Sequence, residues 1–222
     1  MDKPFTVYGA AGSGSVPVEA ALTLLGLPFT VVEAPAWEQD EGVQATIGRV
    51  NPMRQIPALI LPGGDVMTES AAILTWLADS HPGSGLAPGL ADPERPAFLR
   101  WMSFVSASIY AHYWLRDDPS RLAKTVEAQD YLLRRSTQRI ADCWAMMDAQ
   151  VSPGRYILGD ELTVLDLYVT VVSRFRPRRH RFYAVAPKMA AVVKRVDADP
   201  GLETFWAERY PFDDGWDEAS EV

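Results

Sequence analysis

The chain has 222 residues, of which 48% are hydrophobic and 23% are charged, and its formal net charge is −8. This composition is typical of a globular protein, and no apolar run is long enough to predict a membrane-spanning helix. The acidic balance offers no electrostatic footprint for nucleic acid. Much of the negative charge lies in the last ten residues, "DDGWDEASEV", which are expected to form a solvated acidic tail (residues 213–222).

The chain contains a single cysteine, Cys143, which excludes an intrachain disulfide and a zinc site built from cysteines. Its first residues, "MDKPFTVYGAAGSG", lack the apolar core of a secretory signal. Both observations favour a reducing compartment. We therefore expect a cytoplasmic protein with no metal, no nucleic-acid partner and no membrane association.

The first part of the chain alternates between strand and helix patterns. Residues 5–10, "FTVYGA", alternate in polarity as a strand does, and residues 15–26 form a helical pattern that ends at a glycine. The β-branched run "LPFTVVEA" predicts a second strand, whereas the pattern of residues 37–52 remains open. "ALILPGGDVMT" predicts two strands joined by a turn, and the helical pattern that follows is closed by Pro82. This order is typical of a small α/β unit with a mixed sheet.

The second part of the chain shows helical patterns and no convincing strand. It is reached through residues 81–93, whose glycines and prolines predict a linker. One of its helices begins at Thr163 and Asp166, which have the spacing of a capping box. We therefore expect an α/β domain over residues 1–80 and an all-α domain over residues 94–212.

The loop after the first strand, in "YGAAGSGSVPVEAAL", is rich in glycine and serine. Such a loop often places a phosphate at the N-terminus of the next helix. Neither phosphate-binding pattern fits here, because Gly14 is followed by Ser15 and Val16, and Pro17 stands where the dinucleotide fingerprint needs its third glycine. The loop is therefore expected to serve a different ligand.

Two motifs resemble the glutathione transferase superfamily, in the order and the architecture of that family. They are "NPMRQIPALILPGGDVMTESAAILTWLADSHP", residues 51–82, and "YILGDELTVLDLYV", residues 156–169. The resemblance spans the whole chain. It implies a thioredoxin-like N-terminal domain that binds glutathione as co-substrate and a C-terminal helical bundle that completes an electrophile pocket. It also implies a homodimer with a role in detoxification.

The resemblance further implies which residues contact glutathione. They are Gln55, Ile56, Pro57, Glu69 and Ser70. In the family the proline is cis, which costs only about 0.5–1 kcal/mol over trans and lets the preceding residue pair with a peptide. A helix start binds a carboxylate, which suits Glu69 and Ser70. Trp37 and Arg49 are further candidates, for the glycyl carboxylate. Judged by structure alone, Pro57 only begins a strand, and Glu69 and Ser70 only begin a helix.

The family also presents a hydroxyl or thiol from the glycine-serine loop to the sulfur of glutathione. A free thiol has a pKa near 8.5, so a pKa lower by about two is needed for it to be mostly thiolate at neutral pH. This difference corresponds to roughly 2.7 kcal/mol of thiolate stabilisation. One hydroxyl and a helix start can supply this. When "VEAAL" is matched to the corresponding helix of the family, Gly12 stands where serine-type members carry the catalytic hydroxyl. Because glycine has no hydroxyl, the catalytic candidates are the nearby Ser13 and Ser15, with Tyr8 or a backbone N–H as alternatives.

The substrate pocket is expected to take side chains from residues 101–118, "WMSFVSASIYAHYWLRDD". The candidates are Ser106, Tyr110, Tyr113 and Trp114, whose rings and hydroxyls suit an apolar or aromatic electrophile. The arginine-rich residues 174–182 are expected to be a solvated helix end and loop, with recognition of an anionic substrate as the alternative.

Two functions remain open from the sequence. The first is a glutathione transferase that attacks a small electrophile or reduces a peroxide. The second is a non-catalytic protein of the same fold that binds a ligand or a protein partner.

Overall fold

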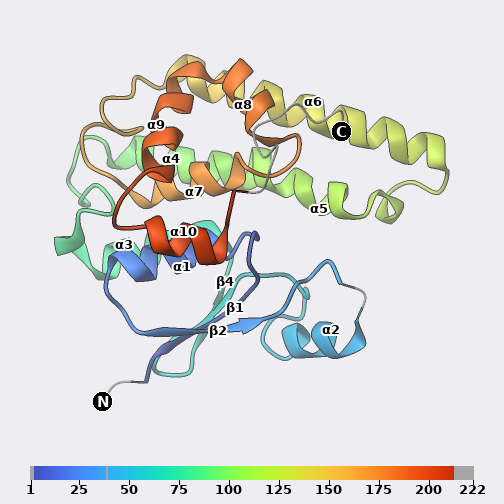
Figure 1. Cartoon of the computed structure of the whole chain (residues 1–222), viewed down its shortest axis with the longest axis horizontal. Coiled ribbons are helices and arrows are strands. Elements are labelled where there is room, and N and C mark those ends of the chain that lie inside the picture. The colour runs from blue at the N-terminus through green and yellow to red at the C-terminus, as the bar shows by residue number, and fades with distance from the viewer. Residues whose placement is uncertain (1–2, 39, 213–222) are drawn as a thin grey trace. The chain divides into compact units, whose positions relative to one another are not determined.

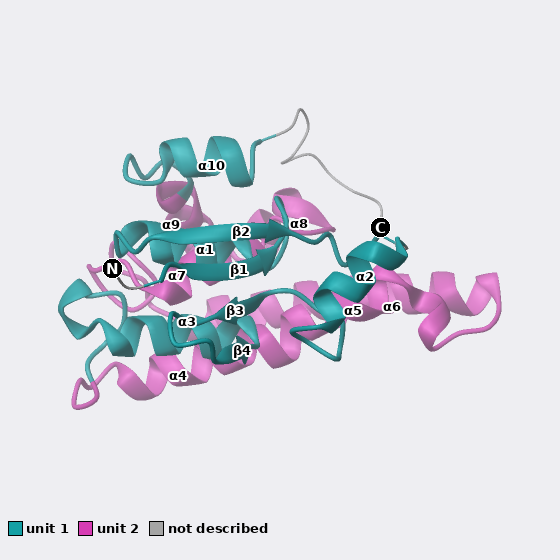
Figure 2. Ribbon diagram, turned by 90° about the horizontal axis from the view of Figure 1, so that it is seen from below, with its two compact units in different colours: residues 1–89, 197–212 teal, residues 90–196, 213–222 magenta. Residues whose placement is uncertain are grey.

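The computed structural model describes residues 3–38 and 40–212, so the predicted acidic tail of residues 213–222 lies outside the described residues. The described chain forms two compact units (Figure 2). The first contains the chain up to Gly89 together with Asp197–Phe212, and the second contains Leu90–Val196. The last helix, which the sequence analysis placed in the all-α domain of residues 94–212, lies in the first unit because it packs against the first helix of the chain.

The first unit is built on a four-stranded mixed sheet (Figure 1). Its strands are β1 (Phe5–Gly9), β2 (Phe29–Glu33), β3 (Ala58–Ile60) and β4 (Val66–Thr68), in the order β2-β1-β3-β4. β1 and β2 run parallel, whereas β3 is antiparallel to both of its neighbours. This is the predicted thioredoxin-like arrangement. Phe5, Val7 and Gly9 of β1 are buried, and the two residues between them, Thr6 and Tyr8, are half-buried, as the alternating sequence indicates.

The helices of the first unit are α1 (Val16–Leu24), α2 (Glu41–Gly48), α3 (Ser70–Ser80) and α10 (Glu203–Arg209). α1, α3 and α10 lie on the same side of the sheet (Figure 1). α1 is buried over most of its surface, and Pro17 lies in its first turn, where a missing N–H costs nothing. α2 lies in the segment that the sequence left open. It buries only Ile47, so it has no apolar stripe, and it begins where Asp40 accepts a hydrogen bond from Val43 N at 2.9 Å.

The second unit is helical, as predicted. Its helices are α4 (Arg95–Phe104), α5 (Ala111–Asp117), α6 (Val126–Gln150), α7 (Val164–Val172), α8 (Arg178–Val185) and α9 (Pro187–Asp197). Its described residues contain no strand beyond an isolated bridge between Tyr156 and Gly159. Between α4 and α5 the chain forms a π-helical segment, Val105–Tyr110, where a regular helix was expected. Such segments often occur at functional sites.

The prediction that the arginine-rich residues 174–182 are a solvated helix end and loop holds for only part of them, since Arg176, His180 and Arg181 are exposed but Arg179 is buried. Arg179 is 0% exposed, and its guanidinium donates to the Thr170 carbonyl oxygen at 2.8 Å and to the Tyr183 hydroxyl at 3.1 Å. Arg174 is also buried. The last carbonyl groups of a helix lack partners within the helix, so the C-terminal turn of α7 provides an acceptor that a sequence pattern does not reveal.

Asp166 closes the predicted capping box at the start of α7. It is fully buried and accepts hydrogen bonds from Thr163 N at 2.8 Å, the Thr163 hydroxyl at 2.9 Å and Ile157 N at 2.9 Å. Burial of its carboxyl group outweighs these hydrogen bonds and raises the pKa of Asp166 to about 6. The residue therefore joins the turn before α7 to the helix itself.

Asp166→Asn is expected to change how stability depends on pH. Because the folded-state pKa of Asp166 exceeds its unfolded-state value, the folded chain binds a proton more tightly, and the stability contributed by Asp166 falls as pH rises from about 4 to about 6. A rise from 3.8 to about 6 corresponds to roughly 3 kcal/mol. Urea unfolding from pH 4 to pH 7 should therefore show that the unsubstituted chain loses this amount relative to Asp166→Asn. Parallel pH profiles of the two proteins would contradict the assignment.

Candidate functional site

The register of the sheet brings three predicted motifs to one edge of the first unit. Tyr8 of β1 pairs with Ala58 of β3, and Ala58 pairs with Thr68 of β4. The chain leaves β1 just after Tyr8, enters β3 just before Ala58 and leaves β4 at Thr68. The serine loop (residues 10–15), residues 55–57 and the start of α3 therefore lie next to one another.

The segment before β3 leaves the backbone groups of Ile56 unpaired among the described residues. The Ile56–Pro57 peptide bond is cis. Within the described part of the chain, neither the N–H nor the C=O of Ile56 has a hydrogen-bond partner. The turn before it is held by Asn51, which is 5% exposed, accepts from Met53 N at 3.0 Å and donates to the Gln55 carbonyl oxygen at 2.9 Å. These features leave the Ile56 backbone available to pair with an extended peptide.

The start of α3 combines a strained residue with a helix N-terminus. Glu69 has φ 68° and ψ 102°, a conformation that is rare for residues other than glycine, and Ser70 is buried in the first turn. Strain of this kind persists only where the surrounding structure enforces it, and it is concentrated at functional sites. The exposed Glu69 side chain and the N–H groups of the first turn can together bind a group that carries both an ammonium and a carboxylate.

The serine loop is held by a buried hydrogen-bond network. The Ser15 hydroxyl lies 2.6 Å from Glu19 Oε1 and 2.9 Å from the Ser13 hydroxyl. The Ser13 oxygen accepts from Ser15 N at 3.1 Å and from Ala10 N at 3.3 Å. Ser13 is 6% exposed, whereas Ser15 and Glu19 are 0% exposed. The structure thus joins both predicted serines to one carboxylate.

The protons of this network can be assigned. A carboxylate only accepts, so the Ser15 proton is the one shared with Glu19. Each hydroxyl carries one proton, so the contact between Ser13 and Ser15 uses the proton of Ser13. Ser15 therefore has no proton left for a ligand. Ser13 can release its proton to a ligand by rotating one hydroxyl.

Glycine residues allow this packing. A Cβ on Gly9 would lie 2.2 Å from the Ser15 hydroxyl oxygen, so no side chain fits at that position. Gly12 has φ +71°, which strains any other residue. This explains why glycine stands at the position where the family resemblance leads one to expect a hydroxyl.

An ion cluster lies behind the serine loop. Arg209 of α10 places Nε 2.6 Å from Glu19 Oε2 and Nη1 2.5 Å from Glu33 Oε1. Its backbone oxygen accepts from Gly12 N at 2.8 Å. Burial of the guanidinium works against its charge, but the hydrogen bonds and charges of Glu19 and Glu33 outweigh this and raise the pKa of Arg209. The last helix of the first unit, α10, therefore holds the serine loop near the N-terminus in place.

Sequence reasoning missed Glu19, Arg209 and the role of the Asn51 side chain. Glu19 did carry a signal, because it is the one acidic residue in the apolar helix "VPVEAALTL". Arg209 carried none, since it lies 190 residues from its partner.

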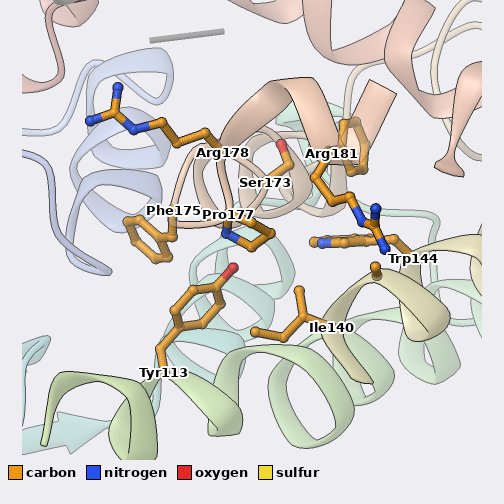
Figure 3. A pocket seen from close by; sticks show the side chains of 10 residues that line it. Tyr113, Ile140, Trp144, Ser173, Phe175, Pro177, Arg178 and Arg181 are labelled. Atoms are coloured by element: carbon orange, nitrogen blue, oxygen red, sulfur yellow. The ribbon is translucent and has the colours of Figure 1, made fainter. Parts of the chain in front are cut away.

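The second unit contains a cluster of aromatic side chains. The ring of Tyr110 lies 6.0 Å from that of Tyr113 and 5.7 Å from that of Phe175, measured between centroids. Tyr113 and Phe175 also line a small pocket with Trp144 and Pro177 (Figure 3). Its cavity volume of about 10 Å³ is far below the roughly 300–1,000 Å³ of typical ligand pockets. This pocket alone is therefore too small to be a complete substrate site.

The remaining predicted residues lie apart from these features. Trp114 is 43% exposed and packs against the Arg121 guanidinium, and Ser106 lies half-buried in the π-helical segment. Trp37 and Arg49 are exposed near the two ends of α2. The described residues include no group of three or more His, Cys, Asp or Glu placed to hold a metal, and none of their helices could span a membrane.

The fold and the arrangement of this sheet edge define a glutathione transferase architecture. Residues 11–80 match the family profile "Glutathione S-transferase, N-terminal domain". A relative in Escherichia coli strain K12, named as the uncharacterized GST-like protein YncG, is 28% identical over 89% of this chain and 94% of its own. Glutathione S-transferase GST-4.5 of Xanthomonas campestris is 26% identical over 89% of this chain and 95% of its own.

Solved structures agree with this assignment. A glutathione transferase homologue from Sulfitobacter, with bound glutathione, superposes with a TM-score of 0.78 at 24% identity, covering 92% of this chain and 97% of the other. A glutathione transferase from Methylococcus capsulatus gives a TM-score of 0.71 at 26% identity, covering 90% and 96%. The family profile, the relatives and the solved structures all support the glutathione S-transferase superfamily.

Asn51→Ala is expected to lower the free energy of unfolding by about 1–2 kcal/mol, because it removes two hydrogen bonds from the turn before Ile56. Urea unfolding measures this change. Asn51→Asp is the matched control, since it keeps the acceptor for Met53 N but loses the donor to Gln55. Unchanged stability of Asn51→Ala would show that the turn holds its shape without this side chain.

Proposed function

We propose that this protein is a glutathione transferase that activates the thiolate of glutathione for attack on a small apolar or aromatic electrophile. The observation that carries the proposal is the sheet register, which brings the serine loop, the Ile56 backbone and the start of α3 to one edge. Glutathione is a peptide with a central cysteine. It therefore needs a backbone partner in its middle, a charge-binding group at its γ-glutamyl end and a donor for its sulfur.

Each part of this edge suits one part of glutathione. The Ile56 backbone pairs with the cysteinyl residue in the manner of a short β-ladder, and Gln55 contacts the peptide beside it. Glu69 binds the ammonium of the γ-glutamyl end, and the first turn of α3 with Ser70 binds its carboxylate. The glutathione bound in the Sulfitobacter homologue supports this ligand for the family fold.

Ser13 is the hydroxyl that donates to the sulfur. It can be released by rotation, whereas Ser15 spends its proton on Glu19. Ser15 then acts by holding Ser13. The N–H groups of Ala11 and Gly14, which have no hydrogen-bond partner in the described chain, are the alternative donors. A hydroxyl donor near the sulfur suits conjugation and also the reduction of a peroxide by the same thiolate.

The electrophile is proposed to be apolar or aromatic because the second unit gathers Tyr110, Tyr113 and Phe175. These rings favour flat apolar ligands.

The alternative function is that of a non-catalytic protein that binds a ligand or partner. It is favoured by the engagement of both serine protons in hydrogen bonds within the loop. Conjugation of glutathione to an aryl halide, measured alongside calorimetric titration with glutathione, separates the two. Turnover supports the transferase, binding without turnover supports the alternative, and absence of glutathione binding contradicts the transferase.

Ser13→Ala is expected to reduce turnover about 10- to 150-fold while glutathione affinity changes little. Of the atoms of glutathione, the hydroxyl contacts only the sulfur, and its bond strengthens as the thiolate forms, so its loss raises the barrier more than it weakens ground-state binding. Steady-state kinetics and calorimetry measure the two effects.

Glu69→Ala is the matched control, because it should weaken binding first. Full activity of Ser13→Ala together with inactivity of Ser15→Ala would reverse the assignment of the two hydroxyls. Full activity of both variants would assign the sulfur to a backbone N–H.

The protein is further proposed to be a cytoplasmic homodimer with a role in detoxification, in keeping with its family. Symmetric pairing of two identical chains is the commonest assembly of soluble proteins. Light scattering at micromolar concentration should give twice the 24.6 kDa of one chain. A mass of one chain at that concentration would contradict the dimer.

A further inference from the structure

The ion cluster behind the serine loop, formed by Glu19, Arg209 and Glu33, has no role in the proposed transferase reaction as described so far. Glu19 Oε1 lies 2.6 Å from the Ser15 hydroxyl, which in turn lies 2.9 Å from the Ser13 hydroxyl. A fully buried carboxylate is therefore two hydrogen bonds from the group that faces the ligand. Buried charges are screened much less by solvent and salt than surface charges are.

The signs of these charges decide their effect on a thiol at the loop. The carboxylate of Glu19 disfavours a nearby thiolate, and the guanidinium of Arg209 favours it. Arg209 is paired with Glu19 at 2.6 Å, so it cancels the charge that stands closest to Ser15. Without that cation, the loop would have an uncompensated negative charge at its back.

Three other titratable side chains lie near the loop, those of Glu33, Tyr210 and Tyr8. The Glu33 carboxylate, at the end of β2, binds Arg209 but not the serines, and its side chain is 53% exposed. The ring of Tyr210 lies beside Gly12, within 3.7 Å of where a Cβ would stand. Tyr8 of β1 points to the opposite side of the sheet from the buried Val7. The Glu19–Arg209 pair is therefore the dominant charged group behind the serines.

We propose that Arg209 and Glu19 are positioning residues that set the acidity of a thiol held at the serine loop, Arg209 by favouring the thiolate and Glu19 by opposing it. This inference rests on the proposed function only in naming glutathione as the natural thiol. It assigns to α10 a direct role at the thiol end of the site. The backbone bond from Gly12 N to the Arg209 oxygen, 2.8 Å long, holds the same two elements in register.

The test uses variants whose effects should have opposite signs. Arg209→Met should raise the pKa of the thiol by about one, a tenfold change in the ratio of thiolate to thiol, and Glu19→Gln should lower it by a similar amount. The double variant should return the pKa close to its unsubstituted value. It also avoids an uncompensated buried charge, so it keeps the test valid if Arg209→Met folds poorly. Arg209→Lys keeps the charge, and Glu33→Gln is the matched control, so both should cause only small shifts.

Two thiols are measured by pH titration of their ultraviolet thiolate absorbance. The first is a thiol introduced by Ser13→Cys in a Cys143→Ala background, which leaves a single thiol and needs no ligand. The second is that of glutathione bound to the unsubstituted loop. If the pKa of the introduced thiol rises in Arg209→Met and falls in Glu19→Gln, the inference is supported. Shifts of the same sign, or none, overturn it, because a merely structural role would disturb the loop in the same way from either partner.

The two proposals fail in different ways. If glutathione does not bind in calorimetry, the proposed function fails, and the introduced thiol still decides the inference. If the introduced thiol shows opposite shifts and bound glutathione shows none, the pair tunes the loop and the sulfur of glutathione lies elsewhere. If glutathione binds and reacts but neither thiol shifts with opposite signs, the transferase stands and the inference is overturned.

Discussion

The pairing of β1, β3 and β4 in one register is the constraint on which the candidate site depends. Because Tyr8, Ala58 and Thr68 stand side by side, three loops from distant parts of the first 70 residues meet at one edge of the sheet. A shift of one residue in β3 would turn the buried Leu59 toward the other face and move Ile56 away from the serine loop. The core of this unit therefore specifies the position of the Ile56 backbone, although Ile56 itself is only half-buried.

A buried carboxylate is costly unless it is fully paired. Glu19 meets this condition with Ser15 on one oxygen and Arg209 on the other. The same bonds that offset its burial also orient the hydroxyl protons of the loop. Stability and site geometry thus depend on one group, and a substitution there affects both.

The fold followed from the sequence where local patterns were strong. The alternation in β1, the closing proline of α3 and the capping box at Thr163 and Asp166 each specify local structure through nearby residues. α2 was not predicted because it buries a single residue and has no apolar stripe. The pairing of Arg209 with Glu19 joins segments 190 residues apart, which no local pattern encodes. The burial of Arg179 depends on a carbonyl acceptor at the end of α7, which the run of arginines does not indicate. Of the candidate site, the motifs at the sheet edge were predictable, whereas the charges behind them were not.

The first unit is discontinuous, and this affects the time at which it can be completed during synthesis. Its sheet is finished by Thr68, but Arg209 follows 141 residues later. At ribosomal rates of about 5–20 residues per second, this separation is roughly 7–28 s. For that interval a nascent sheet has its Glu19 carboxylate without its guanidinium partner. The serine loop therefore acquires its final electrostatic surroundings only after translation has passed Arg209, so a chain terminated before that residue keeps the motifs of the sheet edge without the cation behind them.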